Sequence, residues 1–197
     1  GQFRLSFGPI PIVLSTNLFL WFRDEIFVWQ FVMIAIVYLS KAYLTREIDG
    51  KRTHIFNPSA FALALVATVL IAGRSVHLTW ANAIPLGLAQ GPLAYEVMFG
   101  AGIISQFFVG ITLMPLSSTI VLIGIGFIYH QLTGTWFYVD TAIPVAMLIA
   151  ISLLVTDPAT SPRTHLGKVL FGALYAVGSM IFYLLFRMIE TPPTADD

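Results

Sequence analysis

The chain has 197 residues, of which 57% are hydrophobic and 10% are charged, and its mean hydropathy is +0.85. This composition excludes a water-soluble domain of this length and is typical of an integral membrane protein. The formal charge is zero and no charged block is long enough to indicate a nucleic-acid partner. Cysteine is absent, which excludes disulfides, thiolate metal clusters and cysteine nucleophiles.

Long apolar runs predict an all-α, polytopic helix bundle of about seven transmembrane helices, forming a single transmembrane domain over residues 1–190. The first run lacks a small-residue cleavage site behind it, which favours a span over a removable signal. The polar tail at 191–197 is expected to be disordered. In chain order the predicted spans are 6–22, 26–44, 57–73, 97–115, 119–134, 141–156 and 166–188.

Residues 76–95 form either an eighth span or a re-entrant or interfacial segment, because prolines and polar residues interrupt their apolar character. Short cytoplasmic loops carry an excess of Lys and Arg. With seven spans, seven of the ten basic residues share the side of the N-terminus, whereas an eighth span divides them five and five. The charge distribution therefore favours seven spans, a cytoplasmic N-terminus and an interfacial 76–95. The seven basic residues are Arg4, Lys41, Arg46, Lys51, Arg52, Arg163 and Lys168.

Two short motifs stand at predicted helix edges, Asn57-Pro58 and Asp157-Pro158. An Asn or Asp cap followed by proline at the first helical position is typical of a helix start. A helix N-terminus at the membrane edge offers free N–H groups and a partial positive charge, which suit a phosphate or an anionic ring oxygen. The motifs thus predict an anion-binding pair on the cytoplasmic face, and two ligand-free helix caps are the alternative interpretation.

The surroundings of these motifs resemble the RnfD/NqrB family, whose members are membrane subunits of the Rnf electron-transport complex and of the sodium-pumping NADH:quinone reductase. Gly50-Lys51 leads into His54-Ile55-Phe56-Asn57-Pro58-Ser59, which resembles the Asn-Pro signature of that family. Thr156-Asp157-Pro158-Ala159-Thr160-Ser161-Pro162, followed by Gly167-Lys168 and Gly172, is similar to its second signature. The first motif is most similar to the short stand-alone members, including those of enediyne biosynthesis.

The resemblance implies two inverted repeats, a multi-pass position in a bacterial inner membrane and other membrane subunits as partners. It implies FMN or riboflavin as a candidate cofactor. In the pumps a Thr in a Ser/Asp-Gly-Ala-Thr motif carries covalent FMN, whereas this chain has Thr133-Gly134-Thr135, without the Ala or the preceding acidic residue. Thr135 is thus only a partial match for covalent attachment, and non-covalent flavin is the alternative. The resemblance assigns flavin binding to His54, Asn57, Pro58, Ser59, Thr156, Asp157, Thr160 and Ser161.

Few polar residues fall inside the predicted spans, and Gln106 is the most central of them. It forms either part of an ion path or an interhelical hydrogen bond, and the hydrogen bond is the favoured interpretation. Small residues predict close helix packing at Gly87-xxx-Gly91, along the run Ser59, Ala60, Ala62, Ala64 and Ala67, and at Gly172-xxx-Ala176. A haem ligated by His77 and His130 would require the two histidines to lie at the same depth in the membrane, on helices that face each other. No metal site is predicted.

Three functions from different classes remain open. The first, which the family resemblance favours over the other two, is a redox-linked membrane subunit that binds flavin or quinone near the two motifs. The second is a channel-like transporter of small solutes, for which Gln106 is the candidate residue. The third is a structural accessory subunit of a larger energy-transducing membrane complex, favoured by the near absence of ionisable residues within the spans.

Overall fold

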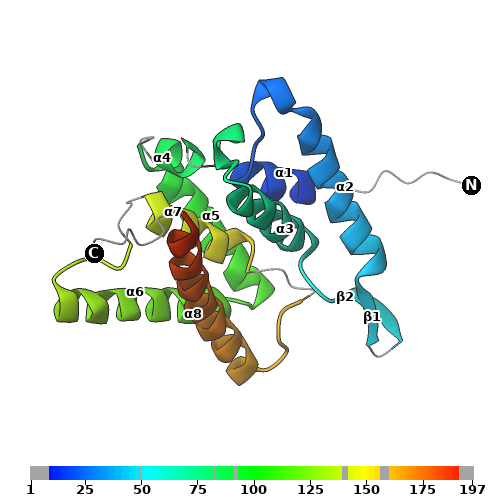
Figure 1. The fold of residues 1–197 in the computed structure, drawn as a ribbon. Helices are drawn as coiled ribbons and strands as arrows, with labels where there is room; N and C mark the ends of the chain where they lie inside the picture. The colour runs from blue at the N-terminus through cyan, green and yellow to red at the C-terminus, as the bar shows by residue number, and fades with distance from the viewer. Residues whose placement is uncertain are drawn as a thin grey trace, which may run out of the picture. The chain divides into compact units, whose positions relative to one another are not determined.

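In the computed structural model the described residues are 9–48, 50–81, 83–90, 93–138, 142–155 and 160–190. Within them the fold is mainly α-helical, in agreement with the predicted all-α class (Figure 1). The chain divides into two compact units, Gly1–Ile84 and Pro85–Asp197, which are described separately below. The predicted tail at 191–197 lies outside the described residues.

The first unit contains the helices α1, α2 and α3, which correspond to the predicted spans 6–22, 26–44 and 57–73. Helix α2 packs against α3, and α1 also packs against α3. The first of these helices ends three residues before its predicted span, of which residues 6–8 lie outside the described residues, whereas the other two agree with the prediction to within two residues. Their bounds are α1 Pro9–Phe19, α2 Val28–Tyr43 and α3 Pro58–Ala72, with a 3-10 turn η1 at Asp24–Ile26.

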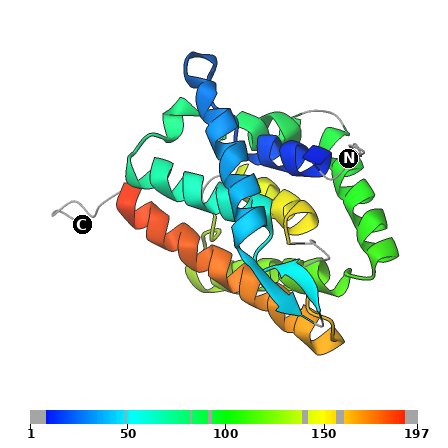
Figure 2. The same cartoon turned by 90° about the vertical axis from the view of Figure 1, so that its right-hand side faces the viewer.

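A β-hairpin joins α2 to α3 (Figure 2). Its strands β1 (Thr45–Ile48) and β2 (Lys51–His54) are antiparallel. Residue Gly50, in the loop between them, has a φ of +71°, which glycine adopts without steric cost. Asp-Gly is a favoured two-residue hairpin loop, so the signal for this element was present in the sequence although only helices were predicted.

At the end of the first unit opposite the hairpin, residues 21–23 form backbone hydrogen bonds with residues 78–80. Phe22 and Thr79 form an isolated antiparallel bridge. Beside it, the Arg23 amide donates to the Leu78 carbonyl at 3.0 Å and the Trp80 amide donates to the Trp21 carbonyl at 2.7 Å. The loop that precedes α2 is therefore fastened to the segment that follows α3.

The segment 76–95, for which an eighth span was one interpretation, is not a single helix. It instead contains the 3-10 turn η2 (Val76–Leu78), the paired Thr79 and the helix α4 (Ala83–Gln90). The described part of α4 has eight residues and is about 12 Å long. The re-entrant or interfacial position of the segment stays a prediction.

The second unit contains α5, α6, α7 and α8, which correspond to the last four predicted spans. Helix α6 packs along α8, and α7 packs against both α5 and α6. One boundary was wrong: Pro115 was placed at the end of a span but lies in the first turn of α6, where proline costs no helical hydrogen bond. The bounds are α5 Ala94–Val109, α6 Leu113–Thr133, α7 Ala142–Leu153 and α8 His165–Glu190.

Within the described residues, two helical segments are long and apolar enough to cross a membrane, Leu113–Thr133 and His165–Met188. At 1.5 Å per residue they measure about 31 and 36 Å. Four shorter apolar helices, of 10–17 residues, accompany them. These are Val28–Tyr43, Pro58–Ala72, Glu96–Val109 and Ile143–Leu153.

The close packing predicted for Gly172 and Ala176 is confirmed, whereas a Cβ atom at Gly87 has nothing within 4 Å among the described residues. A Cβ atom at Gly172 would overlap the carbonyl oxygen of Met114 on α6, so only glycine fits. The Ser118 hydroxyl donates to the Gly172 carbonyl at 2.7 Å, and the Ser117 hydroxyl donates to the Val169 carbonyl at 2.7 Å. Ala176 is fully buried. Small residues and serine hydroxyls thus join α6 to α8.

Candidate functional site

The start of α3 has the capped geometry that the sequence predicts. Asn57 is the N-cap, and its side-chain oxygen accepts from the Ser59 amide at 3.0 Å and the Ala60 amide at 3.3 Å. Pro58 occupies the first helical position and has no N–H. The next amide, that of Phe61, donates to the Asn57 carbonyl at 2.9 Å. The amides that would face an anion at this helix start are therefore already bonded within the chain.

The four predicted site residues of the first motif lie together, at the base of the hairpin and the start of α3. Pro58 and Ser59 are buried, and the Ser59 hydroxyl accepts from the Ser15 hydroxyl of α1 at 3.1 Å. His54 ends β2 opposite Thr45. Its Nδ1 atom is buried and has no hydrogen-bond partner among the described residues. These contacts give the motif a structural role, and its flavin-binding role stays a prediction.

The second motif is described only in part. Thr156 and Asp157 lie outside the described residues, so the predicted Asp157 cap is one of the features that the structure does not describe. Thr160 and Ser161 are half-buried. The helix that follows, α8, begins at His165, after Thr164, whose hydroxyl accepts from the Gly167 amide at 3.0 Å. Because the two motifs belong to different units, their predicted placement on one face also stays a prediction.

The residues that follow the second motif have packing roles within the second unit. The Lys168 ammonium group donates to the Gly110 carbonyl at 2.6 Å. Gly110 is the C-cap of α5, where a cation favourably meets the last carbonyls of a helix. A Cβ atom at Gly167 would lie 2.8 Å from the Thr164 hydroxyl oxygen. Gly167, Lys168 and Gly172, which carried the family resemblance, are thus each engaged in helix ends or helix contacts.

Thr135, the candidate for covalent flavin attachment, is exposed in the loop after α6. Its hydroxyl lies 3.1 Å from that of Thr133, and its amide donates to the same Thr133 hydroxyl at 3.3 Å. The neighbouring Trp136 ring stacks on His130, with ring centroids 4.3 Å apart. Burial, and then the proximity of Tyr183, raise the pKa of Tyr138 to about 12, so this phenol stays protonated at neutral pH.

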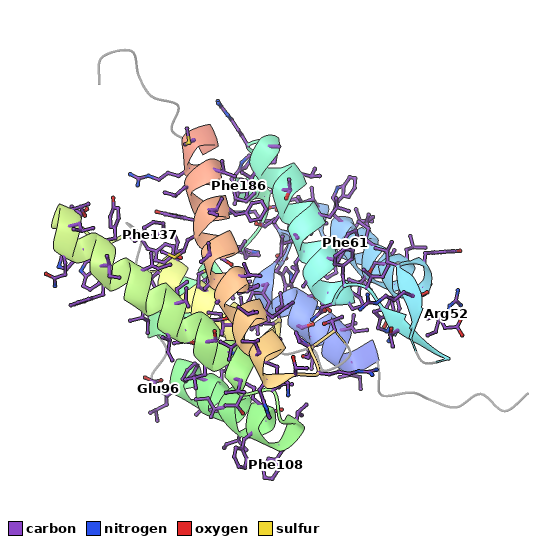
Figure 3. The ribbon with its side chains drawn as sticks, turned by 90° about the horizontal axis from the view of Figure 1, so that it is seen from below. Arg52, Phe61, Glu96, Phe108, Phe137 and Phe186 are labelled. Carbon is purple, nitrogen blue, oxygen red and sulfur yellow. The ribbon has the colours of Figure 1, made fainter. Side chains whose placement is uncertain are left out.

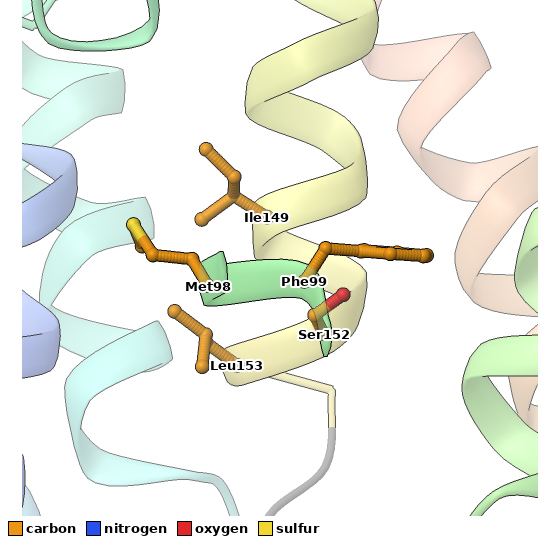
Figure 4. A pocket seen from close by; sticks show the side chains of 5 residues that line it. All are labelled: Met98, Phe99, Ile149, Ser152 and Leu153. Carbon is orange, nitrogen blue, oxygen red and sulfur yellow. The ribbon is translucent and has the colours of Figure 1, made fainter. Parts of the chain in front are cut away.

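The predicted interhelical hydrogen bond of Gln106 is confirmed. Gln106 is 3% exposed, and its amide group donates to the Ser152 carbonyl at 3.0 Å, which joins α5 to α7. A small hollow lies beside this contact, lined by Met98, Phe99, Ile149, Ser152 and Leu153 (Figure 4). Its lining is almost entirely apolar, so it offers no hydrogen-bonding pattern for a flavin ring or an ion.

Gln30 is the polar residue whose role was not predicted. It is buried in α2, and its side-chain nitrogen donates to the Asn17 side chain and, at 3.2 Å, to the Leu20 carbonyl. Its side-chain oxygen accepts from the Phe22 amide at 3.1 Å. Gln30 therefore joins α2 to the end of α1 and to the loop between them. The signal available in the sequence was a polar residue near the start of an otherwise apolar run, which indicates a buried hydrogen bond.

Comparisons of the chain with models of known protein families, with curated proteins and with solved structures find no match. The resemblance carried by the two motifs therefore stays a prediction. Within the described residues, no group of three side chains of the metal-ligating types comes together.

Replacing Asn57 with alanine is expected to reduce the free energy of unfolding by about 1 kcal/mol, because the Ser59 and Ala60 amides lose their acceptor. Asn57→Ser is the matched control, since serine caps helices nearly as well. Thermal unfolding of the purified chain in detergent measures both variants. Equal losses in the two variants would show that the cap is not what Asn57 contributes.

Proposed function

We propose that this chain is a multi-pass integral membrane subunit that packs within a larger energy-transducing complex of a bacterial inner membrane. The observation that carries the proposal is the large number of big apolar side chains that are exposed to the surroundings. Polar side chains without charge are buried beside the apolar core. The buried polar residues among those described are Thr16, Gln30, Ser40, Ser59, Thr79, Gln106, Ser118 and Ser152.

The apolar residues are exposed along whole helices and not in single patches. Phe108 on α5 is 82% exposed and points away from the helices around it (Figure 3). The exposed residues of α8 recur along its length, at Leu166, Leu170, Leu174, Ile181, Phe182 and Leu185. Soluble monomers rarely expose apolar surface on this scale. Lipid tails or other membrane subunits would cover it without an energetic cost.

Charge supports the multi-pass arrangement and its orientation. Helix α6 contains no Asp, Glu, Lys or Arg, and the charged residues of α8 lie near its two ends. In the first unit, residues 41–54 contain four basic and two acidic residues. The opposite end, around η1 and η2, has Arg23 and Arg74 with Asp24 and Glu25. By the positive-inside rule the hairpin end is cytoplasmic.

A redox-linked subunit is the second candidate, and the paired motifs favour it through their resemblance to the Rnf and sodium-pump subunits. At the start of α3, the Asn57 side chain already accepts from the Ser59 and Ala60 amides, which a flavin phosphate would need. The geometry favours the packing role over the redox role.

The proposal predicts that the chain stays in the membrane fraction after an alkaline carbonate wash, because its exposed apolar helices lie in the bilayer. Extraction in mild detergent is expected to bring along other membrane subunits in fixed ratio, measured by mass spectrometry of the intact assembly. Release by carbonate would contradict the membrane assignment, and an isolated monomer would contradict the subunit role. An optical spectrum of the same sample distinguishes the second candidate, which requires flavin absorbance.

A further inference from the structure

The β-hairpin between α2 and α3 combines exposed cations with exposed apolar side chains. Arg46 on β1 and Arg52 on β2 are both exposed. Arg52 extends from the hairpin away from the helices (Figure 3). A shallow open hollow in this region is lined by Thr45, Arg46, Glu47, Gly50 and Arg52.

The two arginines belong to neighbouring cross-strand pairs of the hairpin. Thr53 lies opposite Arg46 and Glu47 lies opposite Arg52, so the two guanidinium groups lie on opposite faces of the hairpin. Within the described residues neither guanidinium group forms an ion pair, and the Thr53 hydroxyl donates to the Arg46 backbone carbonyl at 3.3 Å. In the described part of the hairpin, each face thus presents one exposed arginine.

Apolar side chains flank the same hairpin at its base. Tyr43, which precedes β1, is 78% exposed, and Phe56, which follows β2, is 52% exposed. Phe56 stacks on Phe61 of α3, with ring centroids 5.8 Å apart, and Ile55 beside it is also exposed. Aromatic rings with a polar neighbourhood are typical of the membrane interface. A free inorganic anion would match the cations but would leave these side chains uncovered.

We propose that the hairpin Thr45–His54 binds the headgroups of anionic phospholipids, with Arg46 on one face and Arg52 on the other contacting their phosphates, while Tyr43, Ile55 and Phe56 contact the acyl chains. The phosphodiester supplies the negative charge and the acyl chain supplies the apolar surface, so one class of ligand covers both features. The binding holds the hairpin at the headgroup layer of one leaflet.

Titration of the full chain in neutral detergent with dioleoyl phosphatidylglycerol, followed by native mass spectrometry, tests the proposal. Replacing both residues, Arg46→Gln with Arg52→Gln, is expected to weaken phosphatidylglycerol binding about 30-fold. The doubly substituted Arg46→Lys, Arg52→Lys protein is expected to retain most of the binding. The matched control is Arg23→Gln with Arg74→Gln, which removes the same charge from the opposite end of the first unit.

Equal weakening by the control pair, or unchanged binding in the hairpin pair, would overturn the proposal. Displacement of the lipid by millimolar inorganic phosphate would show a free-anion site, and equal binding of phosphatidylcholine would show that charge is not recognised. The elution profile of each variant establishes that it is folded. These outcomes do not depend on the carbonate wash, so failure of lipid binding and failure of the membrane assignment are distinguishable.

Discussion

Replacing Gly172 with alanine is expected to lower the unfolding temperature of the chain by about 10 °C, a loss of about 3 kcal/mol. The new Cβ atom would overlap the Met114 carbonyl oxygen and lie 3.1 Å from the Met114 carbonyl carbon. Because both are backbone atoms, no side chain can rotate to relieve the clash. The helices α6 and α8 must separate, and the Ser118 hydrogen bond to Gly172 is then lost.

Gly178→Ala is the matched control for this substitution. Gly178 lies on the same helix, and a Cβ atom there has nothing within 4 Å. This variant is expected to be as stable as the original chain or slightly more stable, because alanine favours helix over glycine. Thermal unfolding in detergent, followed by tryptophan fluorescence, compares the two. Equal unfolding temperatures for the two variants would contradict the close approach at Gly172.

Replacing Gln30 with leucine is expected to cost about 3 kcal/mol, because it removes the partner of two buried backbone groups and of one partly buried side chain. The Phe22 amide, the Leu20 carbonyl and the Asn17 side chain each lose the bond to Gln30. Hydrogen exchange at the Phe22 amide is expected to accelerate, because this amide loses its hydrogen bond to the Gln30 side chain.

Gln131→Leu is the control, because Gln131 is exposed near the end of α6. Its effect on the free energy of unfolding is expected to stay within about 0.5 kcal/mol. The measurements are thermal unfolding and hydrogen exchange of both variants under the same conditions. Protection of the Phe22 amide that survives in Gln30→Leu would show that the glutamine does not fasten the loop.

The sequence was sufficient for the number and order of the long helices. Apolar runs are the strongest signal that a chain of this composition carries, and each predicted run contains a helix. The predicted span end at Pro115 was wrong. Proline disrupts the interior of a helix but is tolerated in the first turn, which is where Pro115 lies in α6. The hairpin was missed because its Asp49-Gly50 signal is short and lies between two much longer apolar runs.

The candidate site was predictable at the level of local chemistry. Asn57 before Pro58 indicated a helix cap, and the structure has one. The sequence could not show that the Asn57 side chain accepts hydrogen bonds from the Ser59 and Ala60 amides, since this depends on the Asn57 side-chain rotamer. Nor could it show the contacts of Lys168 and Gly172, whose partners lie more than 50 residues away along the chain. Motif spacing alone does not separate such packing roles from ligand binding.

The Gln30 network also has a consequence for biosynthesis. The described part of α1 has 11 residues and a length of about 16 Å. Its polar residue Asn17 is satisfied by a side chain that is translated 13 residues later. In a bilayer this order of synthesis would favour insertion of α1 together with α2, because an unpaired amide in hydrocarbon costs free energy. A nascent chain halted between them would leave the Asn17 side chain without this hydrogen bond.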